Sequence, residues 1–229
     1  MGSIGNNLQE VKRRIAAACV AARRPANSVT LLAVSKTKPE SAVREALAAG
    51  QHAFGENYVQ EGLAKIDALA DLRAQIEWHL IGPLQSNKTR AVAEAFDWVH
   101  SVDRLKIAER LAAQRPAGLP PLNVCLQVNI SGETSKSGMS VLELPAVARA
   151  VRTLPGLRLR GLMAIPEPSD DAATQHASHR ALRELLAALN AQGQALDTLS
   201  MGMSDDLEAA VAEGATLVRV GSAVFGARG

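Results

Sequence analysis

The sequence has few of the residues on which several classes of protein depend. Its 229 residues include only two cysteines, Cys19 and Cys125, and aromatic side chains make up 3% of the chain. Two cysteines in apolar surroundings do not form a disulfide framework, and without a CxxC or a mixed cysteine–histidine spacing we expect no metal site. So few aromatic residues also argue against a surface that stacks nucleic-acid bases.

Strong net charge and long apolar segments are missing as well. The 25 basic and 23 acidic residues give a formal net charge of +2, too small to attract nucleic acid or an anionic membrane. The longest apolar run, residues 15–22, is too short to cross a bilayer, and the polar start of the chain is unlike a secretory signal. We therefore expect a cytoplasmic protein that binds neither nucleic acid nor membrane.

The chain does contain a regular alternation of strand-like and helical segments. It begins with an amphipathic helix, in which Leu8, Val11 and Ile15 recur at helical spacing. Eight apolar runs follow, each succeeded by a helical pattern; they are 29–36, 52–56, 76–82, 98–103, 122–130, 157–165, 198–203 and 216–221. Alternating strands and helices predict a parallel sheet.

Eight strand–helix units in this length predict a closed (β/α)8 barrel. The alternative is an open doubly wound sheet, but its usual number of strands is lower. We therefore predict an α/β fold with a single domain over residues 1–229. A helix at 1–25 would precede a TIM barrel at 29–229, and a barrel without a sheet edge leads us to expect a monomer.

Lys36 stands at the end of the first strand-like run. Functional groups of such barrels lie at the carboxyl ends of the strands. Lys36 has the same parity as Leu32 and Val34, so an inward-facing row would carry it into the barrel mouth. There a neutral amine can attack an aldehyde and form a Schiff base. The pattern alone leaves open a lysine that only reaches water from the end of a strand.

The last two strand ends indicate a site for phosphate. The segments LSMGMSDD and RVGSAVFG follow the seventh and eighth strands, where this fold commonly binds phosphate, and both are rich in glycine and serine. Arg219 lies within the last apolar run and needs a partner there, either a structural carboxylate or a ligand's ring nitrogen or phosphate. A lysine for an aldehyde, a phosphate site and a buried arginine together describe pyridoxal 5′-phosphate.

Segments along nearly the whole chain resemble the signature blocks of the pyridoxal phosphate homeostasis proteins. These segments are AVSKTKP, FGENYVQE, WHLIGPLQSNK, SVDR, VNISGETSKSGM, GLMAI, LSMGMSDD and GATLVRVGSAVFG. The last block departs slightly, because it reads GSAVFG where an acidic residue and threonine or isoleucine are familiar. The resemblance implies a fold-type III barrel like the N-terminal domain of alanine racemase, which carries pyridoxal phosphate as an aldimine on Lys36.

The resemblance also implies roles for other residues. Arg219 would face the pyridine nitrogen, while Ser200, Gly221 and Ser222 would hold the phosphate, with Met201 close to it through backbone contacts. Two further residues, Asn57 and His79, would lie near the ring, although His79 could equally be a core histidine beside Trp78. Finally, the resemblance assigns Lys38 and Lys136 an auxiliary part in handling a second cofactor molecule, with a solvated lysine as the alternative for Lys136.

Two functions are compatible with these residues, a cofactor carrier and an amino-acid racemase. Racemisation needs an acid or base on each face of the cofactor ring. Lys36 could supply one, but Tyr58 is the only tyrosine, and no second domain is predicted to close over the site. We therefore expect no catalytic residue. The predicted function is intracellular homeostasis of pyridoxal phosphate and vitamin B6, with apo-enzymes that use this cofactor as recipients.

Overall fold

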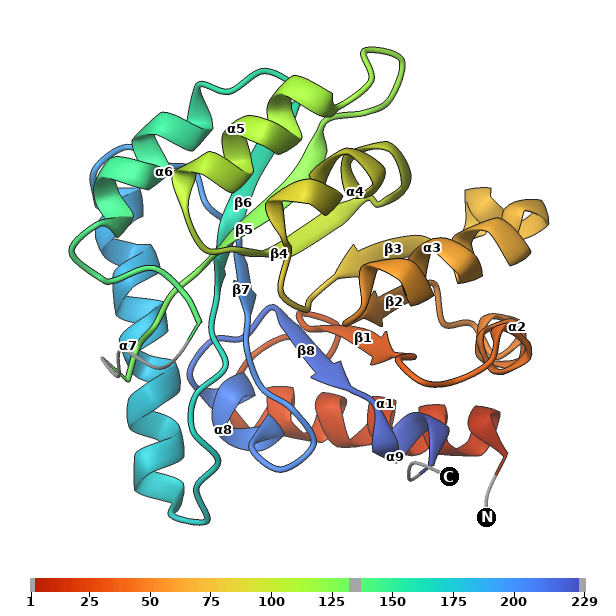
Figure 1. The fold of residues 1–229 in the computed structure, drawn as a ribbon. Coiled ribbons are helices and arrows are strands. Elements are labelled where there is room, and N and C mark those ends of the chain that lie inside the picture. Colours follow the sequence, from red (N-terminus) through yellow and green to blue (C-terminus); the bar gives the residue numbers. More distant parts are fainter. Residues whose placement is uncertain (1–2, 132–136, 227–229) are drawn as a thin grey trace.

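Eight parallel strands form a closed barrel in the structure, a computed structural model that describes residues 3–131 and 137–226. Within this part of the chain the strands follow one another around the barrel in sequence order, and β8 pairs with β1 to close it (Figure 1). Leu31 of β1 lies opposite Val218 of β8 in that closing ladder. The predicted (β/α)8 architecture is therefore confirmed, including the helix that precedes the first strand.

Helices and strands alternate along the chain (Figure 1). The strands are β1 Thr30–Val34, β2 Ala53–Glu56, β3 Glu77–Leu80, β4 Trp98–Val102, β5 Leu122–Gln127, β6 Leu157–Met163, β7 Thr198–Ser200 and β8 Leu217–Val220. The α-helices are α1 Ile4–Ala21, α2 Glu40–Ala48, α3 Val59–Ala68, α4 Thr89–Ala95, α5 Leu105–Gln114, α6 Leu144–Arg152, α7 Ala172–Ala191, α8 Leu207–Ala212 and α9 Ser222–Phe225. Two 3₁₀ turns, Ala70–Gln75 and Ser86–Lys88, were not predicted.

The strands are shorter than the apolar runs that predicted them. The first run extends to Lys36, but β1 ends at Val34, and the seventh extends to Met203, while β7 ends at Ser200. The sheet ladder stops at these points, and the remaining residues of each run form the rim of the barrel. The side chains at the strand ends are therefore carried by loops that a rigid sheet supports.

Alternation along β1 separates two apolar regions. Leu31 and Ala33 belong to the main core, which lies between the sheet and the surrounding helices. Leu32 and Val34 belong to a smaller cluster with Ala53 of β2 and Leu217 of β8, which occupies part of the interior of the barrel. The inward direction of this second row fits the parity argument made for Lys36.

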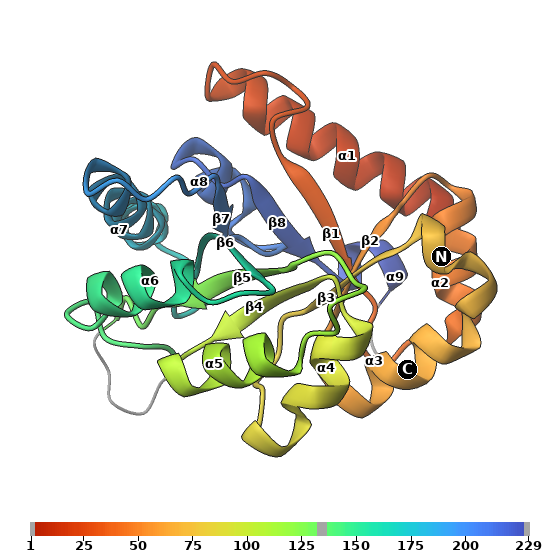
Figure 2. The same ribbon diagram turned by 90° about the horizontal axis from the view of Figure 1, so that it is seen from above.

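Helix α1 packs outside the barrel rather than contributing to the sheet. Ser3 caps its first turn by accepting a hydrogen bond from the backbone N–H of Asn6 at 3.3 Å. The buried face of the helix includes Leu8 and Ile15, and the helix lies beside α2, α8 and α9 (Figure 2). Burial of each such side chain stabilises the fold by about 1.5–3 kcal/mol. The first and last described helices thus cover the same side of the barrel.

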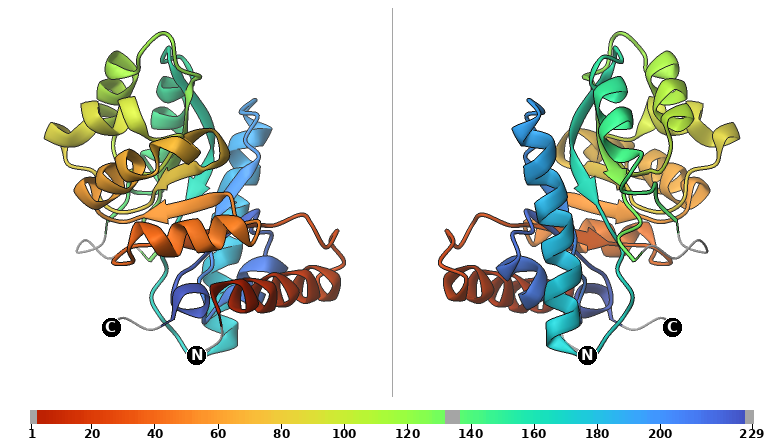
Figure 3. Two further views of the ribbon diagram at one scale, coloured as in Figure 1. Left: turned by 90° about the vertical axis from the view of Figure 1, so that its right-hand side faces the viewer. Right: turned by 90° about the vertical axis from the view of Figure 1, so that its left-hand side faces the viewer.

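The long helix α7 lies along the outer surface of the barrel beside α8 (Figure 3). Asp171 caps its start, because the carboxylate accepts a hydrogen bond from the N–H of Thr174 at 2.9 Å. In the described part of the chain, neither α7 nor any other helix is long and apolar enough to cross a membrane.

Candidate functional site

A cavity of about 420 Å3 opens at the carboxyl ends of the strands. Its size lies within the range of about 300–1,000 Å3 that is typical of small-molecule sites. Six of the residues singled out in the sequence lie in its wall; they are Lys36, Lys38, Asn57, Arg219, Gly221 and Ser222. The structure therefore brings together groups from the ends of β1, β2 and β8.

The backbone on either side of Lys36 is held by hydrogen bonds. Before it, the N–H of Ser35 donates to the carbonyl of Gly55 on β2 at 3.0 Å. After it, Thr37 has a left-handed backbone with φ of 63°, and its N–H donates to the Glu61 carboxylate. No described residue binds the amine of Lys36, which lines the cavity between these two fixed points.

A buried ion cluster beneath this turn restrains its backbone. The ammonium group of Lys65 on α3 donates to the carbonyl of Ser35 at 2.6 Å and to the carboxylates of Glu56 and Glu61 at 2.8 and 2.7 Å. Glu56 is fully buried and also accepts from the Ser35 hydroxyl at 2.5 Å. Burial raises the pKa of Glu56, and Lys65 opposes that shift. We call Ser35, Glu56, Glu61 and Lys65 the Lys36 clamp.

Asn57 supplies an acceptor to the cavity. Its side-chain oxygen is buried and has no hydrogen-bond partner among the described residues. An amide oxygen in that condition costs free energy unless a ligand or water satisfies it. Together with the amine of Lys36, it leaves the cavity with polar groups available to a bound molecule.

The loop after β7 forms one side of the cavity through a tightly fixed backbone. Gly202 has φ of 91°, and a Cβ at this position would lie 2.4 Å from the Cβ of Ala210. Asp206 accepts hydrogen bonds from the N–H of Met203 at 2.6 Å and from His179 at 3.0 Å. Although burial opposes it, these bonds lower the pKa of Asp206. The loop therefore presents Met203, Ser204 and Asp205 to the cavity in one conformation.

Arg219 places a buried positive charge in the same wall. Only 4% of the residue is exposed, and burial lowers the pKa of its guanidinium to about 10, so it stays charged at neutral pH. Nη1 donates to the carbonyl and the hydroxyl of Ser200 at 2.6 and 2.9 Å, and Nη2 donates to the carbonyl of Ala164 at 2.9 Å. No described residue accepts from Nε. The structural carboxylate considered from the sequence is not present within 4 Å among the described residues.

Three described residues predicted for the site do not line this cavity; they are Ser200, Met201 and His79. Ser200 and Met201 are fully buried, Ser200 in contact with Arg219 and Met201 in the main core. His79 is 1% exposed and stacks on Trp98 inside the barrel, with ring centroids 5.3 Å apart. Lys136 lies outside the described residues. A short apolar run does not indicate how its strand is aligned with its neighbours. The sequence therefore could not separate residues at the rim of the barrel from those one layer deeper.

The structure also adds residues that sequence reasoning did not single out. Asp205 lines the cavity. Lys65 of the Lys36 clamp does not line it but donates to the carbonyl of Ser35, the residue before Lys36. A signal for Lys65 was available, because it lies three residues after Gly62 and four before Leu69, both buried on the same helical face. A lysine on a buried face needs a partner.

These groups suit a particular kind of ligand. Lys36, Lys38 and Arg219 are positive and Asp205 is negative, which favours an anion, while Val34 and Ile81 give the cavity apolar wall. The amine of Lys36 can react with an aldehyde, and the serines and the glycine-containing turn can donate to phosphate. The site fits a phosphorylated aromatic aldehyde. Among the described residues no three histidine, cysteine, aspartate or glutamate side chains are placed to hold a metal ion.

Comparisons with known proteins agree with this chemistry. The family model described as alanine racemase, N-terminal domain, matches residues 6–229. The chain is 65% identical to the pyridoxal phosphate homeostasis protein of Pseudomonas aeruginosa over 228 residues, which covers 100% of this chain and 97% of that protein. It is 56% identical to the protein of the same name from Escherichia coli over 229 residues, covering 100% and 98% of the two chains.

A solved structure with a ligand is also similar. PipY of Synechococcus elongatus, whose structure has PLP bound, is 44% identical and superposes with a TM-score of 0.81. The similarity covers 93% of this chain and 100% of PipY. The matching family model begins within α1 and extends past the end of β8.

Proposed function

The chain belongs to the alanine racemase N-terminal domain family and, within it, to the pyridoxal phosphate homeostasis proteins, and we propose that it binds pyridoxal phosphate and carries it on Lys36. The observation that carries the proposal is the unbound amine of Lys36 in the wall of a cavity that also contains a buried arginine, with the backbone next to Lys36 held by the Lys36 clamp. The cofactor supplies an aldehyde that condenses with a primary amine, and the protein supplies everything that orients it.

Each residue of the cavity wall has a part in this proposal. Lys36 holds the cofactor covalently, and Arg219 keeps a positive charge in the cavity that disfavours protonation of the ring nitrogen. Asn57 offers its unpaired amide oxygen to a hydroxyl group. Gly221 and Ser222 donate to the phosphate, since the first N–H groups of a helix have no partner within it. Lys38 is an auxiliary cation at the mouth.

We propose a carrier rather than an enzyme. Catalysis of racemisation needs a second acid or base opposite Lys36. The ionisable residues of the cavity wall in the described part of the chain are Lys36, Lys38, Asp205 and Arg219, whereas Tyr58 is 60% exposed and lies outside that wall. A protein that holds a reactive aldehyde without turning over amino acids can buffer it and deliver it to apo-enzymes. The barrel closes its own sheet, so we propose that it does this as a cytoplasmic monomer.

Turnover separates the carrier from the racemase. Protein loaded with pyridoxal phosphate is incubated with L- and D-amino acids, and the enantiomers are quantified over many equivalents of protein. The carrier proposal predicts no sustained conversion, together with transfer of the cofactor to an added apo-enzyme. Sustained racemisation that disappears in Lys36→Ala would replace the carrier by an enzyme.

A further inference from the structure

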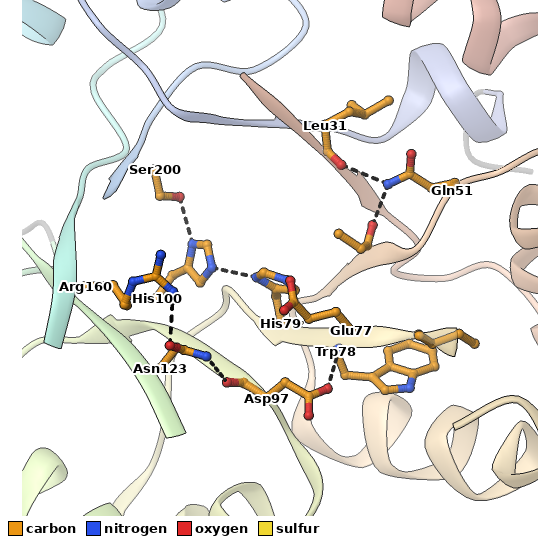
Figure 4. Close-up of polar contacts among 12 residues, drawn as sticks. Leu31, Gln51, Glu77, Trp78, His79, Asp97, His100, Asn123, Arg160 and Ser200 are labelled. Carbon is orange, nitrogen blue, oxygen red and sulfur yellow. Dashed lines mark hydrogen bonds and ion pairs between the residues drawn. The ribbon is translucent and has the colours of Figure 1, made fainter. Parts of the chain in front are cut away.

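A continuous line of polar side chains crosses the interior of the barrel and ends at Arg219. Arg219 donates to the hydroxyl of Ser200, which contacts Nδ1 of His100 at 2.7 Å. His100 Nε2 contacts His79 Nδ1 at 2.9 Å, and His79 Nε2 contacts Glu77 at 2.8 Å. Figure 4 shows the part of this line from Ser200 through His100 to His79. The residues come from β8, β7, β4 and β3.

The two ends of the line differ in charge and exposure. Ser200, His79 and His100 are at most 1% exposed, whereas the side chain of Glu77, at the start of β3, is 49% exposed. The line therefore connects a buried cation at the cavity with a carboxylate at the opposite end of the barrel. The hydrogen bond from His79 lowers the pKa of Glu77, so the carboxylate is ionised at neutral pH.

Neutral histidines permit only one placement of the hydrogens. The Glu77 carboxylate can only accept, so His79 Nε2 donates to it and His79 Nδ1 must accept. His100 Nε2 then donates to His79, which leaves His100 Nδ1 to accept from the Ser200 hydroxyl. The Ser200 oxygen, with its hydrogen used, presents its lone pairs to Arg219. Burial holds the pKa of His100 well below its usual value, in agreement with a neutral ring.

Every donor in the line thus points away from Arg219 and towards Glu77. We propose that Ser200, His100 and His79 are positioning residues for Arg219: they hold its guanidinium through Nη1 and leave Nε to a ligand in the cavity. The guanidinium is buried without an ion-pair partner among the described residues, so the line also stabilises its charge. The family resemblance implied that Ser200 holds the phosphate and that His79 lies near the ring. In this proposal both residues act through Arg219 instead.

The hydrogen placement can be tested without any cofactor. Nitrogen NMR of histidine-labelled protein in its cofactor-free form should show, for both His79 and His100, a hydrogen on Nε2 and none on Nδ1. A hydrogen on Nδ1 of His100 would overturn the proposed direction of the line. The identity of the ligand rests on the proposed function. The NMR measurement does not, because it uses the protein without any ligand.

Two ligands then distinguish positioning from phosphate binding. Ser200→Ala should weaken binding of pyridoxal phosphate and of phosphate-free pyridoxal by the same factor, about tenfold to a hundredfold for a lost hydrogen bond to a charged group. His100→Gln should weaken both in the same way. Equal affinity in Ser200→Ala and the native protein would overturn the proposal, and weakening confined to pyridoxal phosphate would assign Ser200 to the phosphate instead.

Ser101→Ala is the matched control. Ser101 is 2% exposed on β4, and its hydroxyl has no hydrogen-bond partner among the described residues. This variant removes a buried hydroxyl of the same kind that lies outside the line, and it should leave both affinities and the histidine signals unchanged. If neither ligand bound the native protein, the proposed function would be wrong. The NMR result would still show whether the hydrogen bonds between Arg219 and Glu77 run in the proposed direction.

Discussion

Removal of the Lys65 ammonium should destabilise the protein far more than loss of an exposed lysine. Lys65→Met keeps the length of the side chain but leaves Glu56, which is fully buried, without its cation. Loss of one partner from a buried ion pair costs about 3–5 kcal/mol. Since small domains are stable by about 5–15 kcal/mol, this is a large part of the total free energy of unfolding.

The destabilisation should depend on pH in a defined direction. Burial already raises the pKa of Glu56 above 4.5, and loss of Lys65 raises it further. The folded variant therefore keeps a proton on Glu56 at a pH where the unfolded chain has released it. Its stability is lost as pH rises from about 4.5 through the raised folded pKa, by at most about 1.4 kcal/mol per unit. The deficit should be greater at pH 8 than at pH 5.

Urea unfolding at both pH values measures this effect. Arg44→Met is the matched control, because its ion pair with Asp71 is exposed and its loss should change the stability far less. Glu56→Gln combined with Lys65→Met should recover most of the loss, since the buried charge has gone. A cost for Lys65→Met as small as that of Arg44→Met, or one independent of pH, would refute the role given to the clamp.

The buried ring of His100 and the left-handed backbone of Gly202 lead to two further predictions. Burial lowers the pKa of His100 well below 6.5, so the unfolded chain binds a proton that the folded chain does not, and stability should fall as pH drops below about 6.5. Urea unfolding at pH 7.5 and 5.5 should show a smaller loss of stability at the lower pH in His100→Gln than in the native protein. Equal losses in the two proteins would contradict a neutral, buried His100. Gly202→Ala should cost more than the roughly 1–3 kcal/mol of left-handed strain, because its Cβ would meet Ala210. Gly50→Ala, with φ of 81° and open space around it, is the thermal-unfolding control, and an equal cost in both would contradict the packing argument.

The barrel could be predicted from the sequence because it depends on a repeating pattern. Eight apolar runs separated by helical spacing leave few architectures. The parity of Lys36 with Leu32 and Val34 indicated the barrel mouth, although the pattern alone left open a lysine that only reaches water from the end of the strand. A phosphate site was predicted in the Gly- and Ser-rich loops because they follow the last two strands. These inferences use local spacing, which the chain displays directly.

The contacts inside the barrel could not be predicted in the same way. His79 and His100 lie on neighbouring strands, but their contact depends on register, with His79 opposite Trp98 in the ladder. The contact of Ser200 with His100 joins residues 100 positions apart across the barrel. Neither contact follows from periodicity. The resemblance therefore assigned Ser200, the last residue of β7, to phosphate, while in the structure its hydroxyl lies beside Arg219.

The most direct test of the account is the lysine that carries the cofactor. Protein loaded with pyridoxal phosphate is reduced with borohydride, digested, and analysed by peptide mass spectrometry. The account predicts the cofactor mass on the peptide that contains Lys36, with the same result in Lys38→Ala and no label in Lys36→Ala. A label on another lysine of the native protein, or a stably labelled Lys36→Ala, would contradict it.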